Sequence, residues 1–301
     1  MSFNMKDCLV IGISSRALFD LDEENQIYEQ QGLEAYRNYV IEHEDVPMKK
    51  GSGFPLVEAL LKLNEKDKRF VEVVIMSRNS ADTSLRIFNS IEYYGLDITR
   101  AALTSGSSLS AYLKAFDVDL FLSSNEVDVK KAIKEGFAAG LIYHNDTYEY
   151  QNTSQLRIAF DGDAVIFSDE AERIYQKDGL QAFQQHEKEH GDVELQAGPL
   201  QKFLKKIVHL QDVHKNGQAL IRTALVTARN APAHTRVIKT LRKWNLRIDE
   251  AFFLGGIHKT QFLEAFGAHI FFDDQRKHLD RAMSVVPSAH VPWIEEENSY
   301  E

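Results

Sequence analysis

The amino-acid sequence predicts an α/β protein built from two tandem copies of one fold, each with a mostly parallel sheet and helices on its faces. Two observations carry this prediction. Short apolar runs of strand length alternate with longer stretches of helical periodicity, which is the pattern of parallel strands joined by helices. The sequence pattern of the first half also recurs in the second half, at an offset of about 144 to 151 residues, which indicates an internal duplication.

The first half alternates between strands and helices up to a polar segment. Residues 143–155 lack apolar periodicity, so we place a boundary there, between a domain at residues 1–145 and a domain at residues 155–301. The expected strands of the first half are residues 9–13, 71–76, 101–104, 120–122 and 138–143, and the expected helices are residues 55–63 and 81–94.

The second half alternates in the same way. An apolar run at residues 156–160 ends in Asp161-Gly162-Asp163, and another at residues 269–272 ends in Asp273-Asp274. Because ligands of open α/β sheets bind beyond the carboxyl ends of the strands, we expect these strand ends to share one crevice. Further strands are expected at residues 221–226 and 251–254, and a helix at residues 260–266.

The two copies share their apolar framework but differ at the candidate site residues. Tyr28, Gly32 and Leu33 of the first copy recur as Tyr175, Gly179 and Leu180. The second copy has Asp161, Asp163, Thr227, Asp273 and Asp274 where the first has Ser14, Arg16, Met76, Ser123 and Ser124. Ordinary surface drift is the alternative. Because all these positions differ together, we favour a catalytic second copy and a first copy that keeps only the fold.

The composition bounds the functions that this chain can perform. A content of 44% hydrophobic and 27% charged residues is typical of a soluble globular protein. The single cysteine, Cys8, cannot form an intramolecular disulfide, which favours a reducing compartment. No apolar stretch approaches the roughly 18 residues that span a bilayer, so we expect a cytoplasmic protein without a membrane partner. The net charge of −10 argues against nucleic-acid binding but not against a small phosphorylated substrate.

The tripeptide Asp161-Gly162-Asp163 offers a geometry for phosphoryl transfer. It places two carboxylates at the end of a buried strand, and the glycine between them lets the backbone turn. One aspartate would attack phosphorus while its neighbour handles the proton on the ester oxygen. The alternative is a simple Asp-Gly turn with two solvated charges.

Further candidates follow other predicted strands of the second half. Thr227 and the adjacent backbone N–H groups could hold a phosphoryl oxygen, although a capping role is the alternative. Lys259 begins a helix and could neutralise a carboxylate and a phosphate together, although most lone lysines are solvated. Asp273 and Asp274 repel each other unless a cation lies beside them, and Mg²⁺ suits such an oxygen site.

The order Asp-x-Asp, Thr, Lys and Asp-Asp resembles the haloacid dehalogenase superfamily of phosphohydrolases. That resemblance implies two Rossmann-like halves with small helical cap inserts. From about residue 9 to residue 292 the chain more closely resembles the cytosolic 5′-nucleotidase I family. This closer resemblance implies Mg²⁺-dependent hydrolysis of nucleoside 5′-monophosphates, usually AMP, by a homo-oligomer that in animals responds to nucleotide effectors. It is carried by residues 14–19 (SSRALF), 159–165 (AFDGDAV), 225–229 (LVTAR), 269–275 (HIFFDDQ) and 290–292 (HVP).

The hypothesis gives each site residue a role. Asp161 is the nucleophile that forms an aspartyl-phosphate, and Asp163 acts first as acid and then as base. Mg²⁺ is expected at the Asp161 carboxylate, the Asp163 backbone carbonyl and Asp274, with Asp273 orienting its neighbours. The residues expected to contact the phosphoryl group or the rest of the substrate are Thr227, Lys259, Arg229, Gly162, Ala228 and Asn230. A structural role for Arg229 stays open, because its counterpart Arg78 is present in the first copy.

A second motif points to different chemistry. His186-Glu187-Lys188-Glu189-His190 matches the zinc-peptidase pattern H-E-x-x-H, in which two histidines four apart on a helix bind Zn²⁺. The polar surroundings and the lack of a third ligand favour a solvated helix instead. The superfamily resemblance implies that residues from about 169 to 194 form a helical cap and contact the nucleoside.

Two other functions remain compatible with the sequence. A phosphatase for other small phosphomonoesters would use the same core, and a substrate panel separates it from a nucleotidase. A non-catalytic nucleotide sensor would fit the first half, which lacks the candidate acids. The acids present in the second half weigh against it. A nucleotide effector could bind in the crevice of the first half, around Ser14 and Ser123.

Overall fold

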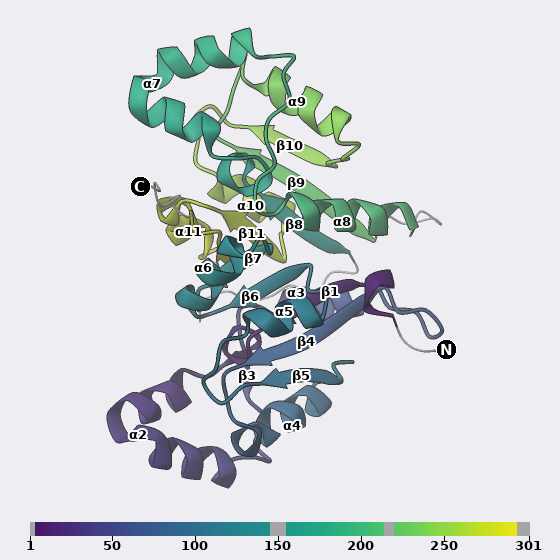
Figure 1. Cartoon of the computed structure of the whole chain (residues 1–301), viewed down its shortest axis with the longest axis vertical. Helices are drawn as coiled ribbons and strands as arrows, with labels where there is room; N and C mark the ends of the chain where they lie inside the picture. The colour runs from purple at the N-terminus through teal and green to yellow at the C-terminus, as the bar shows by residue number, and fades with distance from the viewer. Residues whose placement is uncertain (1–3, 145–154, 214–219, 294–301) are drawn as a thin grey trace.

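One sheet runs across the whole molecule (Figure 1). The computed structural model describes residues 4–144, 155–213 and 220–293, so most of the boundary expected at residues 143–155 lies outside the described residues. The strands of this sheet are, in chain order, β1 (Leu9–Ile13), β4 (Val71–Ser77), β5 (Arg100–Leu103), β6 (Leu120–Ser123), β7 (Ala139–Ile142), β8 (Leu156–Phe160), β9 (Ile221–Thr227), β10 (Glu250–Phe253), β11 (Ile270–Asp273) and β12 (Ser288–His290).

The strand order is β10-β9-β8-β11-β12-β7-β6-β1-β4-β5. Every neighbouring pair is parallel except β12 and β7, which meet antiparallel at the centre of the sheet, with Ala289 opposite Ile142. In each half of the sheet, the first strand along the chain therefore lies between the second and the fourth. The mostly parallel α/β sheet that the alternating sequence pattern predicts is confirmed. A small antiparallel pair, β2 (Phe19–Asp20) and β3 (Lys49–Lys50), lies apart from it.

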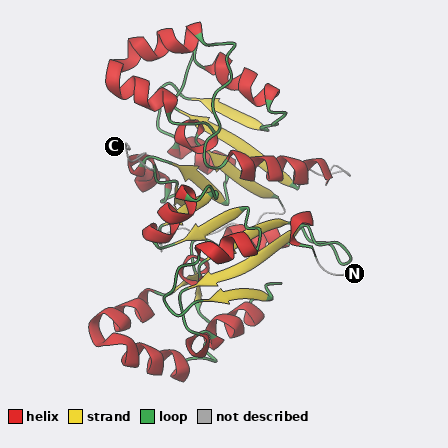
Figure 2. Cartoon of the chain, in the orientation of Figure 1, coloured by secondary structure: helices red, strands yellow, loops and turns green. Residues whose placement is uncertain are grey.

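Helices connect the strands and cover the sheet (Figure 2). They are α1 (Ser15–Leu18), α2 (Asp22–Glu42), α3 (Phe54–Leu61), α4 (Leu85–Tyr93), α5 (Ser110–Ala115), α6 (Glu126–Lys134), α7 (Glu170–Glu189), α8 (Gln201–Val213), α9 (His234–Lys243), α10 (Thr260–Phe266) and α11 (Arg276–Ala282). None of the described helices is long and apolar enough to cross a membrane.

The core lies on both faces of the sheet. Leu9 and Ile11 of β1 belong to one buried apolar cluster, while Val10 between them belongs to another. In β8, Phe160 and Ala159 divide between clusters in the same way. Because successive side chains of a strand point to opposite faces, strands covered on both faces must be apolar throughout. This is why most of the strands are visible in the sequence as largely apolar runs, although β4, β8 and β9 each include one charged residue.

The two longest helices, α2 and α7, lie at opposite ends of the molecule (Figure 1). Each bends in its middle at a glycine in the left-handed region, Gly32 with φ 84° and Gly179 with φ 80°. Glycine adopts such a φ at no steric cost, so the same bend recurs where the sequence repeats a glycine. α7 accounts for most of the segment expected as a cap.

The helix expected at residues 81–94 is divided. A 3₁₀ turn at Ala81–Thr83 precedes α4, and the Ser84 hydroxyl between them donates a hydrogen bond to the Ser80 carbonyl at 2.7 Å. Serine competes for backbone partners in this way, which favours turns over continuous helix.

Candidate functional site

The candidate site lies at the carboxyl ends of β8, β9 and β11, which are neighbours in the sheet. Asp161 directly follows β8, Thr227 ends β9 and Asp273 ends β11. Parallel strands bring their carboxyl ends to one edge of a sheet. The strand order therefore gathers residues that are far apart in the sequence at a single place.

The chain turns sharply after β8. Residues Gly162–Ile166 form a single π-helical turn in which Ala164 has a φ of 58°. Asp161 Oδ1 accepts a hydrogen bond from the Gly162 N–H at 2.7 Å. A Cβ atom on Gly162 would lie 3.4 Å from Thr227 Oγ1, which in turn accepts a hydrogen bond from the Arg229 N–H at 3.2 Å. The ends of β8 and β9 are thus in close contact.

Lys259 lies between two carboxylates of the site. It precedes α10 and follows a turn at Gly255 and Gly256, whose φ angles are 57° and 94°. Lys259 Nζ lies 2.9 Å from Asp161 Oδ1 and 2.6 Å from Asp273 Oδ2. All three side chains are buried. The lysine that the sequence singled out therefore reaches back to the strand ends.

Burial and mutual attraction set the electrostatics of this triad. Burial raises the pKa of Asp161 to about 7, although Lys259 opposes the rise. Burial acts on Asp273 in the same direction, but Lys259 and His278 outweigh it and hold the pKa of Asp273 below its usual value. The two carboxylates likewise outweigh burial at Lys259 and raise the pKa of its ammonium group. The lysine therefore remains charged and keeps Asp273 ionised.

Asp273 and Asp274 have different surroundings. The Asp273 carboxylate binds Lys259, accepts a hydrogen bond from the Gln275 N–H at 2.8 Å, and lies 3.2 Å from His278 Nδ1. Asp274 Oδ1 is buried and has no hydrogen-bond partner among the described residues. Burial, then Asp161 and Asp273, raise the pKa of Asp274 to about 9. Asp273 is thus engaged by several partners, whereas Asp274 forms no ion pair with the residues that the structure describes.

Asp163 is held by Arg229. Arg229 Nε donates to Asp163 Oδ2 at 2.9 Å and Nη2 donates to Oδ1 at 2.7 Å, which is a bidentate pair. The Arg229 side chain is only 2% exposed, whereas that of Asp163 is 20% exposed. Burial opposes the charge of Arg229, but Asp163 and Glu187 raise its pKa above the ordinary value. The guanidinium is committed to carboxylates and does not face an open cavity.

The other predicted substrate contacts lie at the surface beyond β9. Ala228 and Asn230 are exposed, and the Asn230 side chain lies against the backbone of Gly255. Among the predicted site residues, Lys259 directly contacts Asp161 and Asp273. Asp163 lies near enough to Asp161 to raise its pKa, and Asp161 in turn raises the pKa of Asp274. Ala228 and Asn230 flank this cluster without joining it.

The H-E-x-x-H residues are arranged around two arginines. The imidazole rings of His186 and His190 stack, with centroids 4.1 Å apart. Glu187 between them is buried and accepts hydrogen bonds from Arg229 and Arg236. Among the described residues, two groups place possible metal-ligand atoms within 4.8 Å of one another, and neither includes His186 or His190.

Sequence reasoning missed His278 and Arg236, and it considered Glu187 only as part of the H-E-x-x-H motif. His278 forms one of those two groups together with Asp161 and Asp273. Glu187 of α7 accepts hydrogen bonds from both Arg229 and Arg236. One signal was available for Glu187. It occupies the position that Val40 holds in the first half, so a buried acid replaces a buried apolar residue in the repeated pattern.

The sheet and the site together define a class of protein: an α/β protein that places a buried cluster of aspartates and one lysine at the carboxyl edge of its parallel strands. The chain belongs to the 5′-nucleotidase family, because the 5′-nucleotidase family model matches residues 1–298.

A human relative supports this membership. The chain is 39% identical over 289 residues to cytosolic 5′-nucleotidase 1B of Homo sapiens. The match covers 92% of this chain and 47% of the relative, so the chain spans about half the length of that protein. No solved structure matches the chain significantly.

Proposed function

We propose that this protein is a Mg²⁺-dependent 5′-nucleotidase that hydrolyses nucleoside 5′-monophosphates, AMP foremost, to nucleoside and phosphate. The observation that carries the proposal is the buried contact of Lys259 with Asp161 and Asp273, in a chain of the 5′-nucleotidase family. A lysine between two carboxylates supplies charge for a phosphate and leaves one carboxylate oxygen free to react.

Two aspartates would divide the chemistry. An Asp161 oxygen attacks phosphorus and forms an aspartyl-phosphate, the bond from phosphorus to the ribose O5′ breaks, and O5′ takes a proton from Asp163. Asp163 then takes a proton from water, whose oxygen attacks phosphorus and releases phosphate from Asp161. Their placement two residues apart on one turn after β8 supports this division.

The remaining residues would hold the phosphoryl group. Lys259 stands beside Asp161 and would offset the charge of a phosphoryl oxygen, while the Thr227 hydroxyl would donate a hydrogen bond to another. Backbone groups at Gly162, Ala228 and Asn230 would line the rest of the pocket. For Arg229 we propose a different role from the one the sequence indicated: it orients Asp163, to which it is bound through two hydrogen bonds.

The donor set of the site fits a hard divalent cation. Asp274 has a buried oxygen without a hydrogen-bond partner among the described residues, beside the carboxylate of Asp161. Oxygen donors of this kind suit Mg²⁺. Asp161, Asp274 and the Asp163 backbone carbonyl would hold the ion, and Asp273 would orient Lys259. When bound, the ion would supply positive charge against the phosphoryl oxygens.

We infer that the two halves arose by duplication. The strand order is the same in both halves of the sheet, and α2 and α7 bend at corresponding glycines. Residues 1–145 would form a degenerate half and residues 155–301 a catalytic half, both Rossmann-like and of the haloacid dehalogenase type, with α7 in a cap at about residues 169–194. We further propose a cytoplasmic homo-oligomer, with a nucleotide effector site in the first half.

Phosphate release from a substrate panel tests the proposed function. We expect the purified protein to release phosphate from AMP when Mg²⁺ is present, and to lose this activity in EDTA. Ribose 5-phosphate should be a much poorer substrate, because it lacks the base that a nucleotidase would recognise. Equal rates with both substrates would instead indicate a general phosphatase for small phosphomonoesters. Nucleotide binding without phosphate release in Mg²⁺ would indicate a sensor.

Replacing Asp274 with asparagine tests which acid binds the ion. We expect Asp274→Asn to weaken Mg²⁺ binding by at least about tenfold, because even residues that only orient ligands contribute that much. Calorimetric titration with Mg²⁺ measures this directly. Stability without metal should not fall, because a pKa raised to about 9 leaves the Asp274 carboxyl largely protonated at neutral pH, and asparagine is a neutral side chain of nearly the same shape. Ser124→Ala, at the corresponding position of the first half, is the matched control. Unchanged Mg²⁺ affinity in Asp274→Asn would contradict the assignment.

A further inference from the structure

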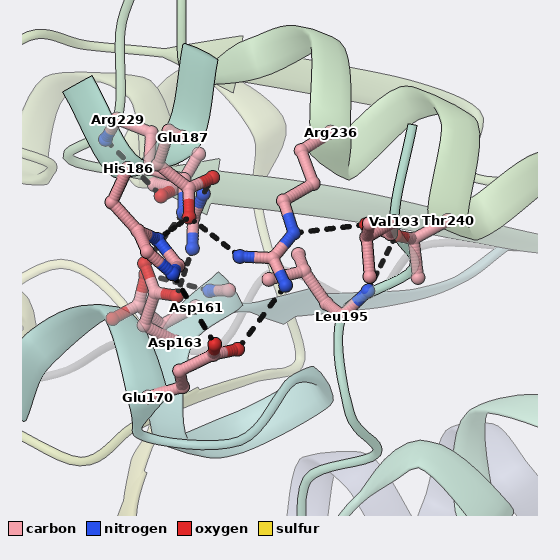
Figure 3. A network of polar contacts seen from close by, with 12 residues as sticks. Asp161, Asp163, Glu170, His186, Glu187, Val193, Leu195, Arg229, Arg236 and Thr240 are labelled. Carbon is pink, nitrogen blue, oxygen red and sulfur yellow. Dashed lines mark hydrogen bonds and ion pairs between the residues drawn. The ribbon is translucent and has the colours of Figure 1, made fainter. Parts of the chain in front are cut away.

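A line of alternating charges connects Asp163 to the cap helix α7 (Figure 3). Glu187 lies on α7, and its two carboxylate oxygens accept hydrogen bonds from two different arginines. Arg229 Nη1 donates to one oxygen, and Arg236 Nη1 donates to the other at 2.8 Å. The Nε and Nη2 groups of Arg229 donate to the two oxygens of Asp163.

Arg236 fixes the far end of this line. Its Nε donates to the Val193 carbonyl at 2.9 Å, and its Nη2 donates to Glu170 Oε2 at 3.2 Å. The side chain of Glu187 is wholly buried, and those of Arg229 and Arg236 are 2% and 3% exposed. Both oxygens of Glu187 are therefore hydrogen-bonded in this arrangement. The bond to Arg229 fixes the direction of the Arg229 guanidinium.

Stability alone does not account for these buried charges. Taking ions out of water costs several kcal/mol for each ion, and well-packed apolar residues of similar volume often stabilise a protein as well or better. The first half has an apolar residue at the position of Glu187, although its Arg86 still pairs with another buried acid, Glu24. Val40 is buried in α2 at the position that corresponds to Glu187 in α7.

Matching contacts establish that correspondence. Tyr39 and His43 stack with centroids 4.1 Å apart, as His186 and His190 do, and in both pairs the second ring bonds the carbonyl of the first residue. Val40 follows the first ring of its pair, as Glu187 follows His186. Arg86 Nε also bonds the Val46 carbonyl at 2.9 Å, the distance at which Arg236 Nε bonds Val193.

The halves differ in the residue two positions after the second strand. In the first half that residue is Asn79, because its N–H bonds Ser77 Oγ at 3.1 Å as the Arg229 N–H bonds Thr227 Oγ1 at 3.2 Å. The match of Arg229 with Arg78 that the sequence suggested is therefore wrong by one residue, and Asn79 donates to the Tyr36 hydroxyl of α2 at 3.1 Å. Arg16 stands in the first half where the second has Asp163. An arginine at this position and a buried glutamate that binds it thus occur together in the half that has an acid to hold, whereas the buried Glu24 of the first half binds Arg86 instead.

We propose that Glu187 is a positioning residue, which holds the Arg229 guanidinium so that it fixes the direction of the Asp163 carboxylate toward the leaving oxygen. This inference rests on the proposed function, in which Asp163 protonates O5′. It also gives α7 a part in the chemistry, because the cap helix supplies the group that aligns the acid. A displacement of an acid by about 1 Å can cost on the order of 10²-fold in rate.

The test compares two substrates that differ in their need for an acid. Nucleoside alkoxide leaves poorly without a proton, whereas the nitrophenolate of p-nitrophenyl phosphate leaves without one. We expect Glu187→Gln to lower kcat/KM for AMP by about 10- to 100-fold, and for p-nitrophenyl phosphate by less than about threefold. Calorimetric binding of AMP without metal should be unchanged, because the Glu187 side chain is buried and already bound to two arginines.

Glu24→Gln is the matched control. Glu24 is a buried acid paired with Arg86 in the first half, so its loss disturbs a similar ion pair without an acid to position. It should lower the melting temperature but leave the ratio of the two kcat/KM values at that of the wild type. If Glu187→Gln fails to fold, Glu187→Asp keeps the charge and shortens the reach, and it is judged by the same ratio.

The outcomes separate this inference from the proposed function. A wild-type protein that releases no phosphate from AMP in Mg²⁺ would overturn the function itself. Where the wild type is active, Glu187→Gln could lose activity equally on both substrates, or lose none on either. Each of these results would overturn only the positioning role. A loss confined to AMP, and absent from Glu24→Gln, would support it.

Discussion

Replacing Asp161 with asparagine should abolish AMP hydrolysis while the protein stays folded. The substitution removes the oxygen that would form the aspartyl-phosphate, and removing a nucleophile costs about 10⁴-fold or more in kcat. The fold should tolerate it, because the asparagine oxygen can still accept from the Gly162 N–H and Lys259 keeps Asp273 as a partner. Phosphate release at saturating AMP and Mg²⁺, together with thermal unfolding, measures both effects.

A matched variant distinguishes chemistry from strand-end disruption. Ser14 follows β1 as Asp161 follows β8, and its hydroxyl caps α1 by accepting from the Ala17 N–H at 3.2 Å. Ser14→Ala should cost about 1 kcal/mol of unfolding free energy through the lost cap, with kcat for AMP unchanged. If Asp161→Asn still hydrolyses AMP at more than a trace rate, Asp161 is not the nucleophile.

Most strands could be predicted from the sequence because they are largely buried and apolar, although the edge strands β5 and β10 are only partly buried. The bounds of β1 and β8 agree with their apolar runs at residues 9–13 and 156–160. Asp161 and Asp273 stand out for a related reason. Each comes at the carboxyl end of a largely apolar segment, Asp161 directly after β8 and Asp273 as the last residue of β11.

The join between the halves could not be predicted from local pattern. The strand β12 has only three residues, and it pairs with β7 across the centre of the sheet. Short strands carry little periodicity, and the pairing depends on two segments more than a hundred positions apart. The long helix α2 was missed because its sequence is polar on most sides and buries few residues. The helix α8 was also missed, although Phe203, Leu204, Ile207 and Val208 recur at helical spacing.

The roles of charged residues also depended on partners that are distant in sequence. The adjacent Asp273 and Asp274 are chemically identical in the sequence. Lys259 and His278 engage Asp273, whereas one buried oxygen of Asp274 has no hydrogen-bond partner in the described part of the chain. Arg229 was assigned to the phosphate, whereas its guanidinium binds Asp163 and Glu187. In each case the sequence predicted where a charge lies but not what it faces.

Removing the charge of Lys259 should affect both stability and rate. Lys259→Met leaves the buried carboxylates of Asp161 and Asp273 side by side without a cation, and breaking a buried ion pair in this way typically costs about 3–5 kcal/mol. The rate should fall by about 10²- to 10³-fold, because a positioned charge at the phosphoryl oxygens is lost. Chemical unfolding in EDTA measures the first effect, and kcat for AMP measures the second.

A double variant separates the two effects. Lys259→Met with Asp273→Asn removes one of the two opposed charges, so much of the lost unfolding free energy should return. The rate should not return, since the neutral pair still supplies no charge to the phosphate. Added Mg²⁺ should likewise restore stability more than rate, because a cation can neutralise the carboxylates without standing where the ammonium group stood. A stable, fully active Lys259→Met protein would contradict the assigned role. The contacts of Lys259 with Asp161 and Asp273 would then contribute neither to stability nor to rate.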